Sequence, residues 1–183
     1  FTGAALFGAG GNSSYQLGNN TTTARQVFKP LSGSWKDVAN GNGFTIAIKE
    51  DGTLWSWGYS TSGALGQGSV TSSPTPQRIG TASNWVTISA GSGHILAVND
   101  TGQLCAWGGN GTGQLGKNNR RNYTTPTLVT GVSNVKQVVA TVYNSYVLKN
   151  DGTLWGCGSE YKGALGSKGS AYLSSFTRIG SAT

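Results

Sequence analysis

The chain has 183 residues, a net charge of +7 from 13 Lys and Arg against six Asp and Glu, and 30 glycines, about twice the usual share. With 36% hydrophobic residues it can form a packed core, which excludes a disordered tail. No apolar run approaches the roughly 18 residues of a membrane span, and two cysteines are too few for a disulfide framework.

Residues 6–10 (Leu-Phe-Gly-Ala-Gly) carry a motif that returns three times along the chain. It becomes Leu-Trp-Ser-Trp-Gly at 54–58, Leu-Cys-Ala-Trp-Gly at 104–108 and Leu-Trp-Gly-Cys-Gly at 154–158. The closing glycines are 48, 50 and 50 residues apart. A fixed period of about 50 residues predicts tandem structural repeats.

Two further blocks keep the same phase. A Leu-Gly pair follows each closing glycine, at 17–18, 65–66, 115–116 and 165–166. Residues 35–39 (Trp-Lys-Asp-Val-Ala) recur as Trp-Val-Thr-Ile-Ser at 85–89 and Val-Lys-Gln-Val-Val at 135–139. Three blocks in phase predict repeat units at residues 1–34, 35–84, 85–134 and 135–183.

Each unit is predicted to consist of strands. Residues 44–48 (Phe-Thr-Ile-Ala-Ile) alternate apolar with small or polar side chains, which is the period of a β-strand. The pair Asp51-Gly52 separates this run from residues 54–57, and an Asp-Gly pair in that place indicates a hairpin. Asp151-Gly152 repeats the signal. No segment keeps a helical period, so we expect very little helix.

Three or four strands in every 50-residue unit predict an all-β fold, a β-propeller with about 3.5 blades of antiparallel strands. Small sheets must stack to bury their apolar sides, and the six phased tryptophans are expected to pack between the blades. A β-solenoid is the alternative architecture.

The propeller is expected to be incomplete. The motif of residues 54–58 occurs four times, but the block at 35–39 and the strand at 44–48 occur three times each, so no whole number of blades results. We expect the chain to begin inside one blade and to end inside another. Because folded proteins avoid open sheet edges, the missing strands are expected from a continuation of the chain or from a neighbouring subunit.

The combined motif resembles the repeat of the regulator of chromosome condensation family. The resemblance is carried by residues 52–58 (Gly-Thr-Leu-Trp-Ser-Trp-Gly), 63–66 (Gly-Ala-Leu-Gly) and 85–98, and it covers essentially the whole chain. It implies blades of a propeller that typically has seven, and a habit of binding proteins or other macromolecules through its faces. It does not imply one partner, because one fold hosts unrelated functions.

No group of residues predicts catalysis, a metal site or a cofactor. Residues 111–116 match GxGxxG, but these glycines belong to the repeat and no helix is expected after them. His94 is the only histidine, and Cys105 and Cys157 stand where other copies have tryptophan. We expect all three to be structural, and we predict that the chain is not an enzyme.

Positive charge concentrates in the segments after each Leu-Gly pair, which contain no acid. Equivalent segments of a propeller occupy equivalent places, so we expect a basic face on one side that attracts an anionic partner, such as a polysaccharide or a nucleic acid. A solvated loop surface is the alternative. The candidate anion-binding residues are Arg25, Lys29, Arg78, Lys117, Arg120, Arg121, Tyr123, Lys168 and Arg178.

The sequence thus predicts a non-catalytic binding or structural module. Only 10% of the residues are charged, and Ser, Thr and Asn are frequent, so the main hypothesis is a virion or extracellular surface protein that contacts other protein chains, a receptor or a glycan. The first alternative is an intracellular regulator like the family's namesake, which exchanges nucleotide on a small GTPase and docks on chromatin. A secreted enzyme inhibitor is the second.

Overall fold

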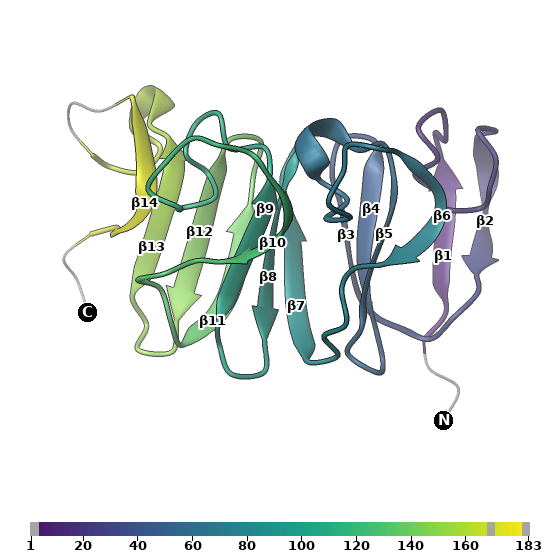
Figure 1. Cartoon of the computed structure of the whole chain (residues 1–183), viewed down its shortest axis with the longest axis horizontal. Coiled ribbons are helices and arrows are strands. Elements are labelled where there is room, and N and C mark those ends of the chain that lie inside the picture. The colour runs from purple at the N-terminus through teal and green to yellow at the C-terminus, as the bar shows by residue number, and fades with distance from the viewer. Residues whose placement is uncertain (1–3, 168–170, 181–183) are drawn as a thin grey trace.

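The computed structural model describes residues 4–167 and 171–180, and these form four antiparallel sheets that lie side by side (Figure 1). The first sheet has two strands and the other three have four each, which confirms the prediction of about 3.5 antiparallel blades. Besides the strands, these residues include two single 3-10 turns, and no helix among them has the length and apolarity to cross a membrane.

The four sheets follow one another along the chain, each as a simple meander. The first sheet contains β1 (Leu6–Gly10) and β2 (Arg25–Leu31). The second contains β3 (Trp35–Asn40), β4 (Phe44–Lys49), β5 (Leu54–Gly58) and β6 (Ser73–Arg78). The third contains β7 (Trp85–Ala90), β8 (His94–Asn99), β9 (Leu104–Gly108) and β10 (Tyr123–Leu128). The fourth contains β11 (Val135–Ala140), β12 (Asn144–Lys149), β13 (Leu154–Ser159) and β14 (Tyr172–Arg178).

One expectation about the incomplete blade is wrong. The chain does begin within a sheet, because β1 and β2 pair only with each other in the described part of the chain. It does not end within one, because β14 completes the fourth sheet by pairing with β13. None of the outer strands was located in the sequence, because β6, β10 and β14 share little sequence with one another, and without β14 the fourth sheet was expected to be incomplete.

The first strand of each four-stranded sheet lies innermost. β3, β7 and β11 contact one another in sequence, whereas β2, β6, β10 and β14 lie on the outer side. Two hydrogen bonds between a side chain and the backbone link these inner strands. The Asp37 carboxylate accepts from the Ile88 N–H at 3.1 Å, and the Ser89 hydroxyl accepts from the Ala140 N–H at 2.9 Å. The inner strands therefore join successive blades around a common axis.

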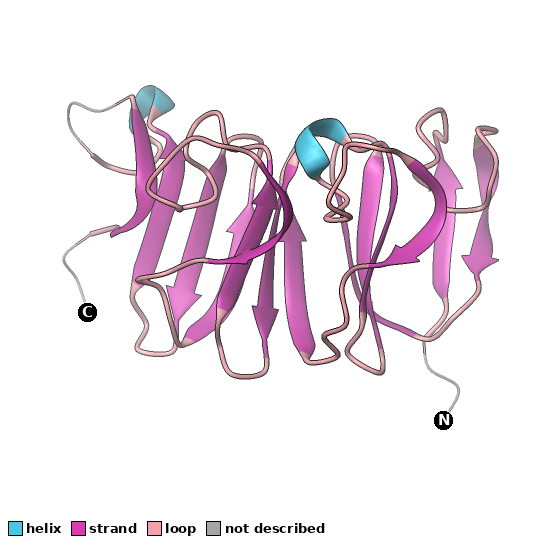
Figure 2. Ribbon diagram, viewed as in Figure 1, coloured by secondary structure: helices cyan, strands magenta, loops and turns pink. Residues whose placement is uncertain are grey.

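The meander gives the propeller two different end faces (Figure 2). We call one the loop face. It contains the long connections from β1 to β2, β5 to β6, β9 to β10 and β13 to β14, and two of these include the 3-10 turns η1 (Thr61–Gly63) and η2 (Tyr161–Gly163). The turns between the first two strands of each four-stranded sheet, at 41–43, 91–93 and 141–143, lie on the same face. The opposite turn face has the tight turns at 50–53, 100–103 and 150–153 and the short links between sheets.

Two of the three tight turns of the turn face contain Asp-Gly pairs, as the sequence predicted. Gly52 has φ of +77° and Gly152 of +82°, a region that residues with a side chain avoid. In the first turn the Asp51 carboxylate accepts hydrogen bonds from the hydroxyl and N–H of Thr53, and these bonds lower the pKa of Asp51. The Asp51 carboxylate therefore stabilises the turn in which it lies.

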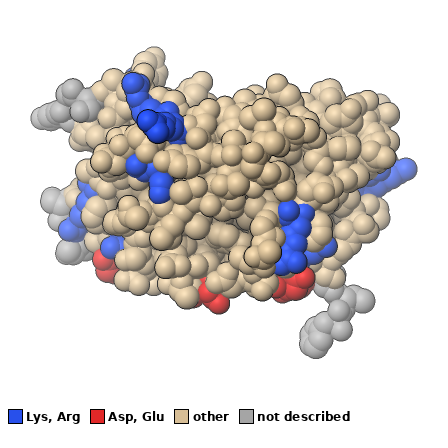
Figure 3. Space-filling model, in the orientation of Figure 1, with Lys and Arg blue, Asp and Glu red and all other residues tan. Residues whose placement is uncertain are grey.

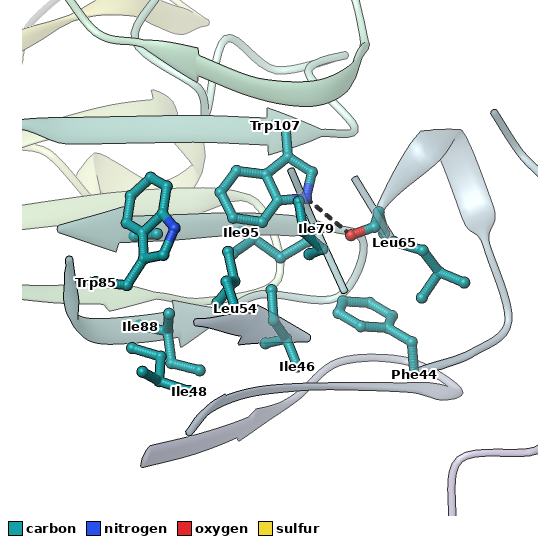
Figure 4. Packing of buried hydrophobic residues seen from close by; sticks show 12 residues of the cluster. Phe44, Ile46, Ile48, Leu54, Leu65, Ile79, Trp85, Ile88, Ile95 and Trp107 are labelled. Atoms are coloured by element: carbon teal, nitrogen blue, oxygen red, sulfur yellow. Dashed lines mark hydrogen bonds between the residues drawn. The ribbon is translucent and has the colours of Figure 1, made fainter. Parts of the chain in front are cut away.

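The core lies between blades (Figure 4). Between the second and third sheets, Ile46 and Leu54 of one sheet pack with Ile95 and Trp107 of the next, all fully buried. Valines such as Val138 and Val147 take the same role between the third and fourth sheets. The phased tryptophans belong to this core as predicted: Trp35, Trp57, Trp85 and Trp107 are buried, and Trp55 and Trp155 are half-buried.

The long connections of the first three sheets are each bonded to the next blade. Asn20 N–H donates to the Pro74 carbonyl at 3.0 Å, and Asn118 N–H donates to that of Ser174 at 2.8 Å. Deeper in the interface, the Trp107 indole donates to the Ala64 carbonyl at 3.0 Å (dashed in Figure 4). The Leu-Gly glycine is needed because a Cβ on Gly66 would lie 2.8 Å from that indole nitrogen.

Candidate binding surface

The two end faces differ in charge. Four of the six acids, Glu50, Asp51, Asp100 and Asp151, lie in turns of the turn face, and a fifth, Asp37, lies on the inner strand β3. In Figure 3, acidic atoms appear only along the lower, turn-face edge of the molecule. Cations on the turn face are therefore accompanied by acids, whereas those on the loop face have only Glu160 near them.

Glu160 is the single acid of the loop face among the described residues, and it is turned inward. It is 8% exposed, and its carboxylate accepts the Leu165 N–H at 2.6 Å and also the Ser167 N–H. Burial raises the pKa of Glu160, but the hydrogen bonds outweigh burial and hold the pKa below its ordinary value. The charge of Glu160 therefore serves its own loop and does little to offset the cations around it.

The connection from β9 to β10 carries the densest group of candidate residues. Arg120 and Arg121 are both exposed, and the Arg120 guanidinium lies 5.4 Å from the ring centroid of Tyr172, a residue of the next blade. Lys117 lies 5.8 Å from the Tyr123 ring, but its ammonium donates to the Leu128 carbonyl. Lys117 therefore helps to hold the outer strand, and the two arginines are the cations of this connection that face a partner.

The loop that presents these arginines is held by its own polar residues. The Asn119 carboxamide accepts the Arg121 N–H at 2.9 Å and donates to the Tyr123 hydroxyl at 3.1 Å. The bond from Asn118 N–H to Ser174 fixes the same loop to β14. A binding group on a braced loop loses less conformational entropy when a ligand binds.

The structure does not gather all the candidate residues on one side, so that expectation is wrong. Arg78 and Arg178 are the last residues of β6 and β14, at the turn face. There their positive charges help to lower the pKa of Asp51 and of Asp151. Arg25 begins β2 at the loop face and Lys29 lies midway along it. Lys168 lies outside the described residues. Charges at the two ends of an outer strand are a strand length apart, so the candidates divide into separate groups.

Three exposed tyrosines on the loop face of the fourth sheet, one of them in contact with Arg120, were not predicted as site residues. Tyr143, in the turn between β11 and β12, is 57% exposed, Tyr161 in η2 is 74% exposed and Tyr172 is 44% exposed. The Tyr143 carbonyl accepts hydrogen bonds from the Thr112 hydroxyl at 3.0 Å and from the Ser159 N–H at 3.1 Å. These bonds join the turn to the β9–β10 connection and to the end of β13. The signal in the sequence was the departure from the repeat, because the equivalents of Tyr143 are glycines.

We name this group the tyrosine–arginine patch. It consists of Arg120, Arg121, Tyr143, Tyr161, Lys162 and Tyr172. Aromatic rings and arginines are the side chains most enriched at the energetic centres of protein interfaces.

The polar groups considered for catalysis lie inside the interfaces. His94 is fully buried, and burial lowers its pKa to about 4. Its Nε2 lies 2.9 Å from the Ser145 hydroxyl, which in turn donates to the Gln114 carbonyl at 2.6 Å. Cys105 and Cys157 are free thiols with pKa raised by burial. Within residues 4–167 and 171–180 no three His, Cys, Asp or Glu side chains come together as metal ligands.

The family model described as the regulator of chromosome condensation (RCC1) repeat matches residues 51–98 and 101–148, and a second model with the same description matches residues 35–64 and 85–114. The chain belongs to the RCC1 repeat family. This confirms the resemblance found in the sequence.

Curated relatives are similar to part of this chain. The X-linked retinitis pigmentosa GTPase regulator of Canis lupus familiaris is 33% identical over 82 residues, which is 42% of this chain and 8% of the relative. The homologue of that regulator in Caenorhabditis elegans is 37% identical over 65 residues, which is 33% of this chain and 5% of the relative. The chain therefore spans less than a tenth of the curated relatives that it matches.

Solved RCC1-type structures share the fold along nearly the whole chain. Prp20p of Saccharomyces cerevisiae superposes with a TM-score of 0.85 at 23% identity, over 97% of this chain and 47% of that one. Human WBSCR16 superposes with a TM-score of 0.86 at 18% identity, over 98% of this chain and 49% of that one. The match thus spans about half the length of each of these solved chains.

Proposed function

We propose that this chain is a non-catalytic, protein-binding segment of an RCC1-type propeller, of the intracellular regulator kind. Among the similar structures, yeast RCC1 (Prp20) was solved bound to Kap60, and Prp20p is described as binding Gsp1p and histones. The curated relatives are named as GTPase regulators. These relatives favour the regulator hypothesis over a virion or extracellular role.

The single observation that carries the proposal is the tyrosine–arginine patch on a face where no described acid is exposed. Arg120 and Arg121 supply positive charge, and Tyr143, Tyr161 and Tyr172 supply rigid apolar area with hydroxyl groups. Such a surface suits a partner that offers carboxylates beside apolar side chains, because charge complementarity steers the encounter and aromatic burial holds the complex. We therefore expect an acidic protein surface as the partner of the loop face.

A binding role also agrees with where the reactive side chains lie. The ring of His94 and the thiol of Cys157 are fully buried between blades, out of reach of a substrate. The acids lie mostly in turns that use their carboxylates for backbone hydrogen bonds. What remains exposed on the loop face is suited to contact and not to chemistry.

The test compares two double variants with equal change of charge. Arg120→Glu/Arg121→Glu reverses two cations of the patch, and Lys36→Glu/Lys136→Glu reverses two cations of the turn face. Binding of purified small GTPases and of an acidic peptide is measured by fluorescence anisotropy, and nucleotide exchange is followed on the same GTPases. We expect the patch variant to weaken binding at least about tenfold and the control less than about twofold. Equal losses in both variants would contradict the proposal.

A second candidate function, in a virion or at the cell exterior, is favoured by composition alone. Only 10% of the residues are charged, and the loops are rich in Ser, Thr and Asn. Its anionic partner would be a polysaccharide. Retention on heparin that drops in the patch variant, together with no binding to any small GTPase, would favour this function over the regulator.

A further inference from the structure

The loop face carries three Asn-Gly pairs, Asn40-Gly41, Asn42-Gly43 and Asn110-Gly111. Asparagine is a chemically labile residue, and it is most easily deamidated when glycine follows, because glycine has no side chain to hinder its own backbone nitrogen. The three pairs have the same local sequence but different surroundings in the fold. The structure therefore allows a comparison of their reactivity.

Deamidation needs no reagent other than water. The backbone nitrogen of the glycine attacks the side-chain carbonyl carbon of the asparagine and loses its proton, and ammonia leaves from that carbon. The cyclic imide then adds water and opens at either carbonyl, which gives aspartate or isoaspartate. The attack requires a carboxamide that is free to turn toward the nitrogen, and a nitrogen whose proton is not held in a hydrogen bond.

Asn42 meets both requirements. It is exposed in the turn between β3 and β4, and its carboxamide makes no hydrogen bond to a described residue. The N–H of Gly43 likewise donates to no acceptor in the described part of the chain. The turn itself is ordered, because the Asn42 N–H donates to the Ser92 carbonyl at 3.0 Å. The reacting groups are thus held close together without being engaged elsewhere.

The other two pairs each fail one requirement. Asn40 is exposed, but the Gly41 N–H donates to the Phe44 carbonyl at 3.0 Å, so the attacking nitrogen is held. Asn110 is 0% exposed. Its carboxamide accepts the Leu115 N–H at 2.9 Å and donates to a backbone carbonyl at 2.9 Å, so it cannot turn toward the glycine.

The accessibility of Asn42 belongs to its place in the repeat. Its equivalents are Ser92 and Val142, in the third and fourth sheets, and each of these sheets follows a complete sheet. Ser92 is nevertheless partly exposed and Val142 is 54% exposed. The N–H of Gly93, like that of Gly43, donates to no described acceptor. A complete blade before the second sheet would therefore leave this turn accessible to water.

We propose that Asn42 is a deamidation site and that the fold protects the other two Asn-Gly pairs. Deamidation places a carboxylate on the loop face, where no described acid is exposed, and lowers the net charge from +7 to +6. Isoaspartate also lengthens the backbone before Gly43, whose carbonyl accepts the Tyr59 N–H at 2.8 Å. The modification thus changes both a charge and a backbone contact, whichever partner the loop face binds.

The test incubates the full chain at physiological temperature and pH, once folded and once in urea. Trypsin then releases residues 37–49, which contain both Asn40 and Asn42, and fragmentation in the mass spectrometer locates each modified position. In the folded chain we expect Asn42 to deamidate at least about tenfold faster than Asn40 and Asn110. In urea the three rates should agree within about threefold, because the surroundings that distinguish the pairs are lost.

Two variants at the same position provide matched controls. Asn42→Ser copies Ser92 of the next sheet and removes the reactive carboxamide, whereas Asn42→Asp produces one of the two products directly. On a cation exchanger the aged protein should yield an earlier-eluting form that elutes with Asn42→Asp. We expect Asn42→Ser to form such a species at least about tenfold more slowly.

Two results would overturn the proposal. One is deamidation of Asn42 and Asn110 at equal rates in the folded chain, which would show that burial and hydrogen bonding of the carboxamide do not decide reactivity. The other is slowing of Asn42 by folding, relative to urea, as strongly as that of Asn40. The turn would then hold the Gly43 nitrogen away from the carboxamide.

Discussion

The same repeat positions behave differently in the second sheet and in the fourth. Ile46 and Leu54 are fully buried against the third sheet, whereas their equivalents Tyr146 and Leu154 lie on a side of the fourth sheet that no further described sheet covers. Leu154 is 40% exposed. The repeat thus sets which side chains point to the next blade, and the presence of that blade decides whether they are buried.

Two substitutions in the fourth sheet accompany this difference. Tyr146 donates through its hydroxyl to the Ala164 carbonyl at 3.1 Å, which is the equivalent of the carbonyl that Trp107 reaches from the third sheet. Gly156 stands where Ser56 and Ala106 do, and a Cβ there would lie 3.3 Å from the Tyr146 ring. The fourth sheet thereby satisfies with its own side chain a carbonyl that in the second sheet is satisfied by its neighbour.

The largest expected difference is at the Leu-Gly glycines. Gly66→Ala should lower the free energy of unfolding by about 4 kcal/mol, because the residue has φ of +68° and the new Cβ would lie 2.8 Å from the Trp107 ring nitrogen. Gly166→Ala, with φ of +72° and no described neighbour within 4 Å of the new Cβ, should lose only about 1 kcal/mol. Urea unfolding of both variants measures the difference, and equal losses would show that a neighbouring blade is not what demands glycine.

The next difference is in apolar burial. Leu54→Ala should lower the free energy of unfolding by about 3 kcal/mol, because the residue is 0% exposed and its removal leaves a cavity between two sheets. Leu154→Ala should lower it by no more than about 1 kcal/mol, since the side chain already contacts water. Chemical denaturation followed by tryptophan fluorescence checks both. A loss at Leu154 as large as that at Leu54 would indicate that the fourth sheet is covered in solution.

A smaller difference separates Phe44 from His94, which hold the same place in successive sheets. Burial keeps the pKa of His94 at about 4, below its ordinary value of 6.5, so His94 is neutral in the folded protein while the unfolded chain takes up a proton below pH 6.5. Stability from this residue is complete above that pH and is lost as the pH falls, by about 2 kcal/mol at about pH 5.

His94→Phe, which copies Phe44, should remove that loss. The neighbouring glycines Gly41 and Gly91 leave room for a ring in both sheets, so the variant is expected to fold. Urea titrations at about pH 7.5 and about pH 5 provide the measurement. An unchanged pH dependence in the variant would assign the effect to other groups.

The smallest expected difference in stability concerns the hydrogen bonds to the carbonyls of Ala64 and Ala164. Trp107→Phe removes the donor to the buried Ala64 carbonyl, and loss of that hydrogen bond should contribute about 1.5 kcal/mol beyond the cost of the smaller ring. Tyr146→Phe should cost less than about 0.5 kcal/mol, because Ala164 is exposed and water can replace the hydroxyl. Thermal unfolding of the two variants ranks them, and a reversed order would mean that the hydroxyl of Tyr146 holds the loop more firmly than its exposure suggests.

Most of the architecture was accessible from the sequence because its signals are local and repeated. Asp-Gly turns, alternating strands and phased tryptophans each have one physical cause, and the same cause acts in every unit. The outer strands were harder to recognise. β6 contains Pro74 and Pro76, which a strand bonded on only one side tolerates, so its sequence does not look like that of a strand.

The candidate surface was less accessible for a geometric reason. The segments rich in cations begin in the loop face, but each continues through an outer strand to the turn face, so Arg120 and Arg178 end far apart. Linear proximity to a Leu-Gly pair therefore does not specify a face. The exposed tyrosines have no phase at all, and only a comparison of each residue with its equivalents, as for Tyr143, could have singled them out.

The bonds between inner regions of the blades have a constant spacing along the chain. Asp37 with Ile88, Ser89 with Ala140, and His94 with Ser145 each connect residues 51 positions apart. Every such bond reaches only the unit that follows, so duplication of a complete 50-residue gene segment would create one new interface and leave the others as they were. Insertion of part of a unit would put all later partners out of step, which restricts changes in the length of such proteins to whole units.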